Sequence, residues 1–480
     1  MALHAQAPTA PTVDPAALWW RIGGALVLLC GAVSLASFFK SDPSQNDFER
    51  FADLRLLFLY FALFTGLCSV YVAVYRQRDA VPRRTLVVTC VACVGLLLAG
   101  FPVGSKDVFF YAFYGKIWGA YHANPYLATI ADFPFDPWQA LVQAQWRDKP
   151  ALYGPLALEQ SWLIHAVTGE HLWGAVWLYK AWATATLLLA LGVAAALLQP
   201  MAAENGIEAT RLPLLAWNPL FLFECAGSAH NEITMVWLLL AALWCWRGGH
   251  RNGALCLLVL SVWYKWYSVI FIPAFLVATL RQSGVRAALR DAVVCAAAAA
   301  LFGWLLLTPL PGSLPTVVNA LLHSGATRGI YPAELSPPLA ALFWSLRASG
   351  LMATDLGFHL FHGVRVTLFG VAVVAIFTQQ WHAADPFAAL RESCCLIAGA
   401  FFLLLVTILP PWHLLPVIAL AVICGREPFL LAAVVLTLLA LLSYFLTFAV
   451  ATVTLCLVAG ALWLMRHFHR GNYGEIAAAG

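Results

Sequence analysis

The amino-acid sequence predicts an all-α polytopic membrane protein, and both its composition and its apolar runs support this fold class. Of the 480 residues, 62% are hydrophobic and only 10% are charged. Soluble domains contain about 25% charged residues, so the composition excludes an ordinary soluble protein. Apolar runs near the length of a bilayer-spanning helix recur along the chain, and they predict a bundle of about 12–14 transmembrane helices.

Short polar or Pro-containing segments separate the apolar runs. Residues 1–16 are predicted to be a disordered N-terminal tail, residues 17–470 a single membrane domain, and residues 471–480 a C-terminal tail. The expected spans are Leu18–Phe39, Leu54–Tyr75, Thr85–Phe101, His171–Leu197, Leu212–Cys225, Asn231–Trp246, Gly253–Lys265, Trp266–Leu280, Asp291–Thr308, Phe361–Thr378, Ser393–Leu409, His413–Cys424, Pro428–Leu446 and Thr447–Met465.

Arginine-rich loops orient the expected bundle in the membrane. Four arginines lie between Tyr75 and Thr85, in the short loop that follows the second span. Cytoplasmic loops carry an excess of Lys and Arg, so this loop is predicted to be cytoplasmic. The same register places the later basic loops and both termini in the cytoplasm. The third span therefore runs outward.

Two long segments are expected on the extracytoplasmic side. In the first, residues 102–170, the apolar run Leu156–Val167 is too short and too polar to cross the bilayer, so we expect a surface or re-entrant helix. The second, residues 310–358, contains short apolar runs interrupted by Pro. Such segments are placed where they line a polar cavity, because irregular backbone cannot face lipid.

One stretch of the first outer segment combines acidic, basic and aromatic residues. Asp107, Tyr111 and Tyr114 have the spacing of one face of a short helix, which also carries Lys116. The Asn-Pro-Tyr sequence at residues 124–126 is expected to break this helix, because Pro disfavours the α conformation in the residue before it. We expect a polar and aromatic patch that lies on the bilayer surface and forms the active site.

Further polar residues are expected at the same face of the membrane. Ionisable groups in or beside a bilayer are costly, so they are candidates for function by default. The set comprises Glu224, His230, Asn231, Glu232, Lys265, Arg328 and His413.

Several of these candidates also have a purely structural interpretation. Asp107 could serve only to stabilise the start of its helix, because a negative charge is favourable near a helix N-terminus. Asn231 could be a helix N-cap. Lys265 could extend its ammonium group to the interface between its Trp neighbours. His413 and Arg328 could be ordinary interfacial residues.

A base, several cations and many aromatic rings beside a bilayer favour glycosyl transfer from a lipid-phosphate donor. A base accepts a proton from an acceptor hydroxyl, and cations stabilise a departing phosphate. A transporter or flippase for a lipid-linked sugar is the competing class. It would place ionisable residues near mid-membrane within broken inverted repeats, and neither is evident in the sequence.

A series of short motifs follows in order along the chain. These are Asp107-Val-x-x-Tyr111-x-x-x-Gly115-Lys116, Asn124-Pro125-Tyr126, Tyr153-Gly-Pro-Leu156, Asn218-Pro-Leu-Phe-Leu-Phe-Glu224 and His230-Asn231-Glu232, with Lys265 beyond them. The series resembles bacterial polyprenyl-phosphate-mannose-dependent mannosyltransferases of the GT-C class. The similarity covers about residues 85–280, and the C-terminal third only in architecture. Departures from the family pattern are Gly154 for Pro, Glu232 for Asp, Lys116 for Arg and His413 for Tyr.

The resemblance implies a GT-C-like bundle whose long first outer loop is catalytic. Asp107 would act as general base in an inverting transfer of mannose to an extracytoplasmic glycan or glycolipid. Lys265, His413 and Arg328 would hold the departing lipid phosphate. The remaining candidates for donor or acceptor binding are Tyr111, Tyr114, Lys116, Asn124, Tyr126, Tyr153, Glu224, His230, Asn231 and Glu232.

The expected partners are a polyprenyl-phosphate sugar donor, a glycan or glycolipid acceptor and the lipid bilayer, with no nucleic acid. No cofactor or metal is expected, since the chain has no Asp-x-Asp or other clear metal cluster. The resemblance implies the bacterial cytoplasmic (inner) membrane, with the active site on its extracytoplasmic face. Transfer of another lipid-linked sugar, such as arabinofuranose or glucose, stays open, as does the acceptor.

Overall fold

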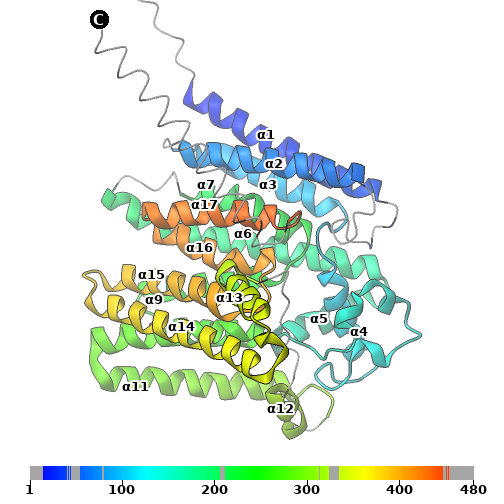
Figure 1. Cartoon of the computed structure of the whole chain (residues 1–480). Coiled ribbons are helices and arrows are strands. Elements are labelled where there is room, and N and C mark those ends of the chain that lie inside the picture. The colour runs from blue at the N-terminus through cyan, green and yellow to red at the C-terminus, as the bar shows by residue number, and fades with distance from the viewer. Residues whose placement is uncertain are drawn as a thin grey trace, which may run out of the picture.

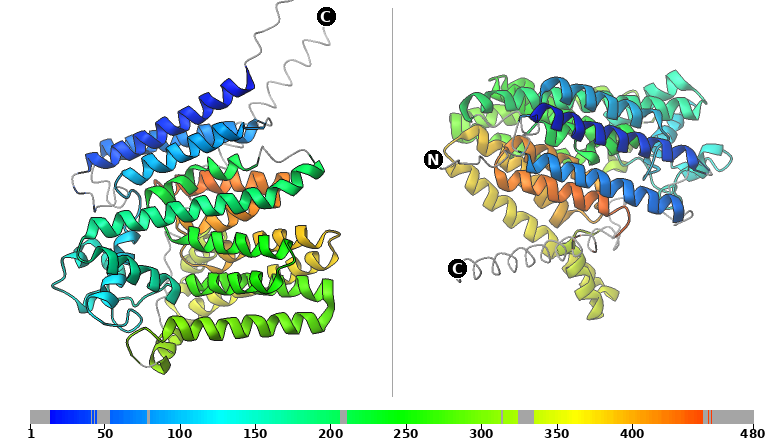
Figure 2. Two further views of the ribbon diagram at one scale, coloured as in Figure 1. Left: turned by 180° about the vertical axis from the view of Figure 1, so that it is seen from behind. Right: turned by 90° about the horizontal axis from the view of Figure 1, so that it is seen from above.

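The computed structural model describes residues 14–40, 42, 44, 54–77, 80–205, 211–312, 314–323, 335–446, 450 and 452. Within these ranges the regular structure is helical, and no strand occurs. The longer helices lie roughly parallel to one another, and a smaller lobe that contains α4 and α5 sits at one end of the bundle (Figures 1 and 2). The expected all-α fold is confirmed.

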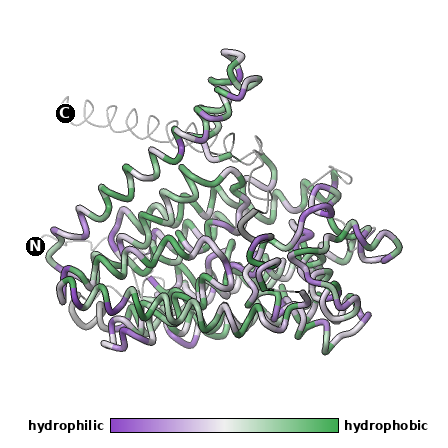
Figure 3. Tube along the Cα trace, turned by 90° about the horizontal axis from the view of Figure 1, so that it is seen from below, coloured by the Kyte–Doolittle hydropathy of each residue, from purple (hydrophilic) through white to green (hydrophobic). Residues whose placement is uncertain are grey.

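Six helical segments of the described chain are long and apolar enough to cross a membrane. Figure 3 shows hydrophobic residues dominating the parallel helices, while hydrophilic stretches recur at helix ends and in the lobe. The protein is therefore a multi-pass membrane protein, as its composition predicts. The six segments are Pro15–Phe39, Leu54–Arg76, Leu172–Gln199, Trp266–Leu307, Asp355–His382 and Pro386–Leu405; they contain or overlap α1 (Pro15–Ala36), α2 (Leu54–Arg76), α6 (Leu172–Asn205), α11 (Ile272–Leu307), α14 (Asp355–His382) and α15 (Pro386–Ala400).

The segment Trp266–Leu307 folds back on itself and forms two spans. Gly284 has a φ of 80°, a left-handed conformation that favours glycine and interrupts α11. Thr279 Oγ1 donates a hydrogen bond to Asp291 Oδ2 at 2.7 Å. A continuous α-helix would hold residues twelve positions apart at about 18 Å, so the two halves of α11 must run in opposite directions. This agrees with the two spans predicted here.

Shorter helices complete the bundle at the positions of other predicted spans. They begin and end within a few residues of the predicted bounds, which is the usual accuracy at helix termini. These helices are α3 (Arg83–Ala99), α9 (Glu232–Arg247), α10 (Arg251–Tyr264), α16 (Leu415–Cys424) and α17 (Glu427–Leu442). A six-residue 3₁₀ segment, Trp266–Phe271, leads into α11, and a four-residue one, Pro411–Leu414, leads into α16.

The predicted continuous span Leu212–Cys225 is wrong. The structure has two short helices, α7 (Pro213–Ala216) and α8 (Pro219–Phe221), followed by a π-helical turn over Leu222–Gly227. Pro219 has no N–H to donate, and the Asn218 side chain accepts hydrogen bonds from the two amides that follow Pro219. These two features restart the helix at residue 219. The wider π-helical turn then carries Glu224.

The lobe consists of α4 (Asp107–Gly119), α5 (Pro155–Thr168) and the 3₁₀ helices Ile130–Asp132, Pro137–Leu141 and Ala144–Trp146. The α4 helix is packed within the protein, because every residue from Val108 to Trp118 is buried against neighbouring elements, and its position at the bilayer surface stays a prediction. The helix also ends at Gly119, before the Asn-Pro-Tyr sequence. His122 reverses the chain there with a φ of 51°.

The second outer segment is partly helical. It contains α12 (Leu314–His323) and α13 (Pro337–Ala348), and α14 already begins at Asp355, six residues before the predicted start. Arg328 lies outside the described residues. The predicted span Thr447–Met465 does too, apart from Val450 and Thr452, as do most of the N-terminal tail and all of the C-terminal tail.

Candidate active site

The carboxylate of Asp107 lies where the lobe meets the bundle. Asp107 is the first residue of α4, and its backbone amide donates to Ser105 Oγ at 3.1 Å. Its side chain is 21% exposed, so a substrate can reach it. Burial raises the pKa of Asp107, against the opposing influence of the nearby His230 and Lys265. A carboxyl with a raised pKa is a stronger base.

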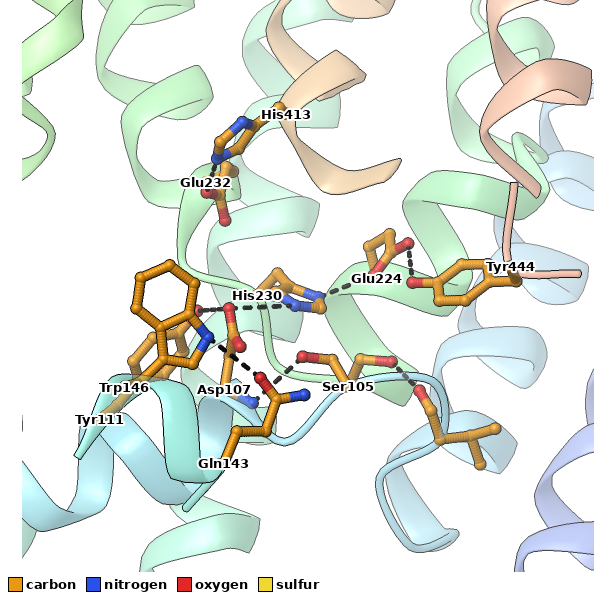
Figure 4. A network of polar contacts seen from close by, with 12 residues as sticks. Ser105, Asp107, Tyr111, Gln143, Trp146, Glu224, His230, Glu232, His413 and Tyr444 are labelled. Atoms are coloured by element: carbon orange, nitrogen blue, oxygen red, sulfur yellow. Dashed lines mark hydrogen bonds and ion pairs between the residues drawn. The ribbon is translucent and has the colours of Figure 1, made fainter. Parts of the chain in front are cut away.

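His230 faces Asp107 and is held from behind by an acidic residue (Figure 4). Its Nε2 lies 3.8 Å from Asp107 Oδ2, and its Nδ1 lies 2.7 Å from Glu224 Oε2. Tyr444 donates its hydroxyl hydrogen to the other Glu224 oxygen at 2.6 Å. The Trp412 ring stacks on the imidazole with centroids 3.9 Å apart. These contacts fix the orientation of the imidazole toward Asp107.

The turn before His230 is a strained piece of backbone. Ala229 has a φ of 65°, which a residue with a Cβ rarely adopts. The His230 amide bonds to the Glu224 carbonyl at 2.8 Å, closing the π-helical turn. Such conformations cluster at functional sites, where the surrounding structure enforces them. Here the strain places Glu224 and His230 side by side.

A second group of charges lies next to this pair. Lys265 donates to Glu232 Oε1 at 2.5 Å, and His413 Nε2 lies 3.8 Å from the same oxygen. The Lys265 ammonium also lies 4.6 Å from the centre of the Tyr153 ring. Asn231 occupies the N-cap position of α9, but its side chain does not cap the helix.

Several buried polar atoms around this group have no hydrogen-bond partner among the described residues. Buried polar atoms in proteins are nearly always paired, so a concentration of unpaired ones calls for an explanation. Polar groups of a bound substrate would supply the missing partners. The atoms are Asn231 Oδ1, Glu232 Oε2 and the Tyr267 hydroxyl oxygen.

Tyr111 and Tyr153 are the two predicted tyrosines that adjoin Asp107. The Tyr111 hydroxyl lies 3.5 Å from Asp107 Oδ2, and the two rings meet edge to face with centroids 5.2 Å apart. The structure therefore brings together Asp107, Tyr111, Tyr153, Glu224, His230, Asn231, Glu232, Lys265 and His413 from the predicted set.

Lys116 lies elsewhere, in a self-contained charge cluster inside the lobe. Its ammonium bonds to Asp136 Oδ2 at 2.6 Å and to Glu170 Oε2 at 2.5 Å. Tyr121 donates to the same Asp136 oxygen at 2.5 Å. Burial of Asp136 opposes its ionisation, but the hydrogen bonds from Lys116 and Tyr121 lower its pKa overall. Lys116 is thus engaged in packing the lobe.

The other predicted polar residues of the lobe also bond within it or to the adjoining chain. Tyr114 donates to the Lys149 carbonyl at 3.4 Å, and Tyr126 donates to the Tyr153 carbonyl at 2.8 Å. Asn124 accepts from the Tyr126 amide at 2.9 Å and donates to the Pro311 carbonyl at 2.7 Å. These contacts hold the lobe's connecting chain against α4 and against the second outer segment.

Sequence reasoning missed Trp412, Tyr444, Tyr267 and Lys180. The chain contains many aromatic residues, so the sequence did not distinguish Trp412, Tyr444 and Tyr267 from aromatic residues with no role in the site. Lys180 did leave a signal, since it is a single cation within the apolar run of α6.

A carboxylate, three cationic or protonatable groups and unpaired polar atoms have the chemistry to bind a polar substrate and accept a proton from it. Among the described residues, no group of three or more His, Cys, Asp or Glu side chains is placed to hold a metal ion. The fold and this cluster define a polytopic membrane protein with a candidate acid–base site at one end of its bundle.

Comparison with known proteins identifies the family. The family model described as alpha-(1->6)-mannopyranosyltransferase, N-terminal domain, matches residues 18–281, more than half of the chain. The chain belongs to this family. The match covers Asp107, His230 and Lys265 but ends before His413.

Two curated mycobacterial proteins are similar over a shorter stretch. A protein of Mycolicibacterium smegmatis named "probable alpha-(1->6)-mannopyranosyltransferase" is 31% identical over 153 residues, which are 31% of this chain and 26% of the relative. An alpha-(1->6)-mannopyranosyltransferase of Mycobacterium tuberculosis is 30% identical over 164 residues, or 31% of this chain and 24% of the relative. The matches thus span about a quarter of each relative.

Proposed function

We propose that this protein is an integral-membrane mannosyltransferase that moves mannose from a polyprenyl-phosphate-mannose donor to an extracytoplasmic glycan or glycolipid. The observation that carries the proposal is the partly exposed carboxylate of Asp107, which lies beside His230 at the junction of lobe and bundle. Membership of a mannopyranosyltransferase family supports the sugar and the reaction type.

In the proposed reaction, the Asp107 carboxylate takes the proton of the acceptor hydroxyl. The acceptor oxygen attacks the anomeric carbon of a β-linked mannosyl phosphate from the opposite face, and the bond from that carbon to the phosphate oxygen breaks. The bonding electron pair leaves with the lipid phosphate, so the product is an α-mannoside. A positioned general base of this kind contributes about 10²–10⁴-fold to a rate.

The departing phosphate gains negative charge, which Lys265 and His413 are placed to stabilise. The Lys265 ammonium lies 2.5 Å from Glu232 Oε1. An ammonium has three N–H donors, so two remain that can donate to the phosphate. Because Lys265 supplies positive charge at this point, the proposed reaction requires no metal. Tyr153, which is only half-buried beside Asp107, is placed to contact the sugar with its ring, and the buried Tyr111 packs behind it.

We also propose that the lobe faces the extracytoplasmic side of a bacterial inner membrane, with both termini in the cytoplasm. The arginines between α2 and α3 support this orientation. A cysteine introduced at Ala144, in the lobe, should react with an impermeant thiol reagent in intact spheroplasts, and one at Gln77 should not. The reversed labelling pattern would contradict the orientation.

The reaction is tested by incubating purified protein with labelled polyprenyl-phosphate mannose and a membrane lipid extract. We expect label in a glycolipid or glycan with an α-mannosidic linkage. Parallel incubations with polyprenyl-phosphate glucose and polyprenyl-phosphate arabinofuranose serve as controls. Transfer from one of those donors, without transfer from the mannose donor, would contradict the proposed sugar.

A further inference from the structure

The segment that joins α3 to α4 determines where Asp107 lies. Residues 100–106 connect Ala99, the end of α3, to Asp107, the start of α4. Gly100 is extended, with φ −76° and ψ 165°. Because such a segment lacks helical hydrogen bonds, its amides and carbonyls need other partners. The groups that provide them therefore control the position of the carboxylate.

Lys180 of α6 supplies partners at the start of this segment. It is fully buried, and its ammonium donates to the Leu97 carbonyl at 2.9 Å and also to the Gly100 carbonyl. The last carbonyls of a helix have no intrahelical partner and carry partial negative charge, so a cation there is favourable. Within the described ranges, no carboxylate lies within ion-pair distance of Lys180. The backbone of α3 and the joining segment is thus its hydrogen-bond partner.

Side chains from two further places, the chain just after α1 and the turn before His230, hold the next part of the segment. Together they pair one backbone group each of Phe101, Pro102 and Val103, so the first half of the segment is held by residues distant in sequence. The Phe101 amide donates to Ser37 Oγ at 2.9 Å, Lys40 donates to the Pro102 carbonyl at 2.8 Å, and Ser228 donates to the Val103 carbonyl at 2.5 Å.

The segment also runs against the aromatic wall of the active site. Gly104 has a φ of 88°, and a Cβ at this position would lie 2.9 Å from a ring carbon of Tyr444 and 3.1 Å from the Phe223 ring. Tyr444 is the residue that bonds to Glu224. A shift of the segment would therefore change both the Asp107 carboxylate and the support behind His230.

We propose that Lys180 is a positioning residue, which anchors the end of α3 and thereby sets the place of the Asp107 carboxylate. The proposal rests on the proposed role of Asp107 as general base. An ammonium buried in an apolar helix is costly, and a role that needs its several donors accounts for its presence. A residue that served only the stability of the bundle would not affect the chemical step selectively.

The Lys180→Met variant removes the ammonium and keeps most of the side-chain volume. We expect kcat for mannose transfer to fall about ten- to hundredfold, because a base displaced by about 1 Å loses that much rate. The KM for polyprenyl-phosphate mannose should stay nearly unchanged. Lys149→Met is the matched control, since among the described residues the Lys149 ammonium forms an ion pair only with its exposed neighbour Asp148, and both constants should be preserved. A raised KM with unchanged kcat would contradict the proposal.

A double-mutant comparison separates positioning from general damage. If Lys180 acts through Asp107, adding Lys180→Met to Asp107→Asn should lower the residual rate by less than twofold. An equal fold-loss in both backgrounds would overturn the proposal. Where the Met variant fails to insert, Lys180→Gln keeps a neutral amide that can still donate to the carbonyls, and it should show the same pattern with a smaller loss of kcat.

Hydrogen exchange tests the anchor without any assay of sugar transfer. In nanodiscs, amides of residues 100–110 should exchange faster in Lys180→Met than in the wild type or in Lys149→Met, because the segment loses a fixed end. Unchanged exchange would overturn the anchoring role. If exchange is faster in Lys180→Met but the wild-type protein transfers no sugar, the anchoring role of Lys180 is supported and the proposed function is contradicted.

Discussion

Two charge clusters, one in the lobe and one at the end of the bundle, use the same residue types in opposite ways. The lobe cluster comprises Lys116, Tyr121, Asp136 and Glu170, and the bundle cluster comprises Asp107, Glu224, His230, Glu232, Lys265 and His413. Both bury a lysine against carboxylates. In the lobe cluster, one buried ammonium is shared by two carboxylates, and a tyrosine bonds to the inner one. In the bundle cluster, a partly exposed carboxylate lies beside buried polar atoms that lack partners.

The difference shows that a buried charge alone does not mark a site. The carboxylate of Asp136 is fully buried and fully engaged, so it has no way to contact a substrate. Asp107 is open to solvent on one side, and its nearest charged partner, His230, is 3.8 Å away. A charged group whose hydrogen-bonding capacity is not fully used can bind a ligand, whereas a fully paired charged group serves to hold the fold together.

Lys265 gives the largest effect among the cations of the bundle cluster. We expect Lys265→Met to lower the rate of mannose transfer about ten- to a hundredfold, because a charge-assisted contact to the phosphate is lost. The protein should still insert, although Glu232 loses its partner. Initial rates of the variant, normalised to folded protein, provide the measurement. Near-normal turnover would contradict a contact between Lys265 and the phosphate and would indicate a purely structural role at the interface.

His230 is expected to have a smaller effect that depends on pH. Burial raises the pKa of Asp107 and His230 opposes that rise, so His230→Gln should raise the pKa further. The base is active only when ionised. The acid limb of kcat/KM should therefore move to higher pH, and a shift of one unit lowers the rate below that pKa about tenfold.

The groups that face this pair are Glu224, Glu232, Lys265, His413, Tyr111, Tyr153 and Tyr444, and they are unchanged in the variant. The matched control is His165→Gln, a buried histidine of α5 outside the bundle cluster. Its pH profile should coincide with that of the wild type. An acid limb that stays in place in His230→Gln would exclude an electrostatic role for His230.

Much of the fold follows from the sequence because hydrophobic length alone specifies it. The length of the apolar runs was enough to predict α1, α2 and α6. The basic residues between two apolar runs also predicted the chain reversal near Gly284. The break at Asn218-Pro219 was not predicted. The hydropathy of that run is high throughout, and only side-chain capping and the missing amide reveal the interruption.

The polar cluster was predictable where charged residues interrupt apolar runs, as at His230, Glu232 and Lys265, and its function stays a prediction. Sequence could not separate Lys116 from Lys265, because each is a lysine beside aromatic residues. The difference lies in partners contributed by distant parts of the chain: Asp136 and Glu170 for the former, Glu232 for the latter. Trp412 and Tyr444 come from the C-terminal third, where the motifs of the N-terminal half give no guidance.

The claim that the bundle cluster is catalytic and the lobe cluster structural is tested most directly by one matched pair, Asp107→Asn and Asp136→Asn. Each variant replaces a carboxylate near a buried cation by an amide of the same shape. The measurements are mannose transfer per folded molecule, donor affinity and apparent melting temperature, in nanodiscs.

Asp107→Asn should lose at least about a hundredfold in transfer, as expected for removal of a general base, with donor affinity and melting temperature nearly unchanged. Asp136→Asn should keep its transfer rate and melt at a lower temperature, because its partner Lys116 loses a charged hydrogen-bond acceptor, at a cost of about 1–3 kcal/mol. The account is contradicted if Asp107→Asn transfers mannose at a substantial rate with intact donor binding.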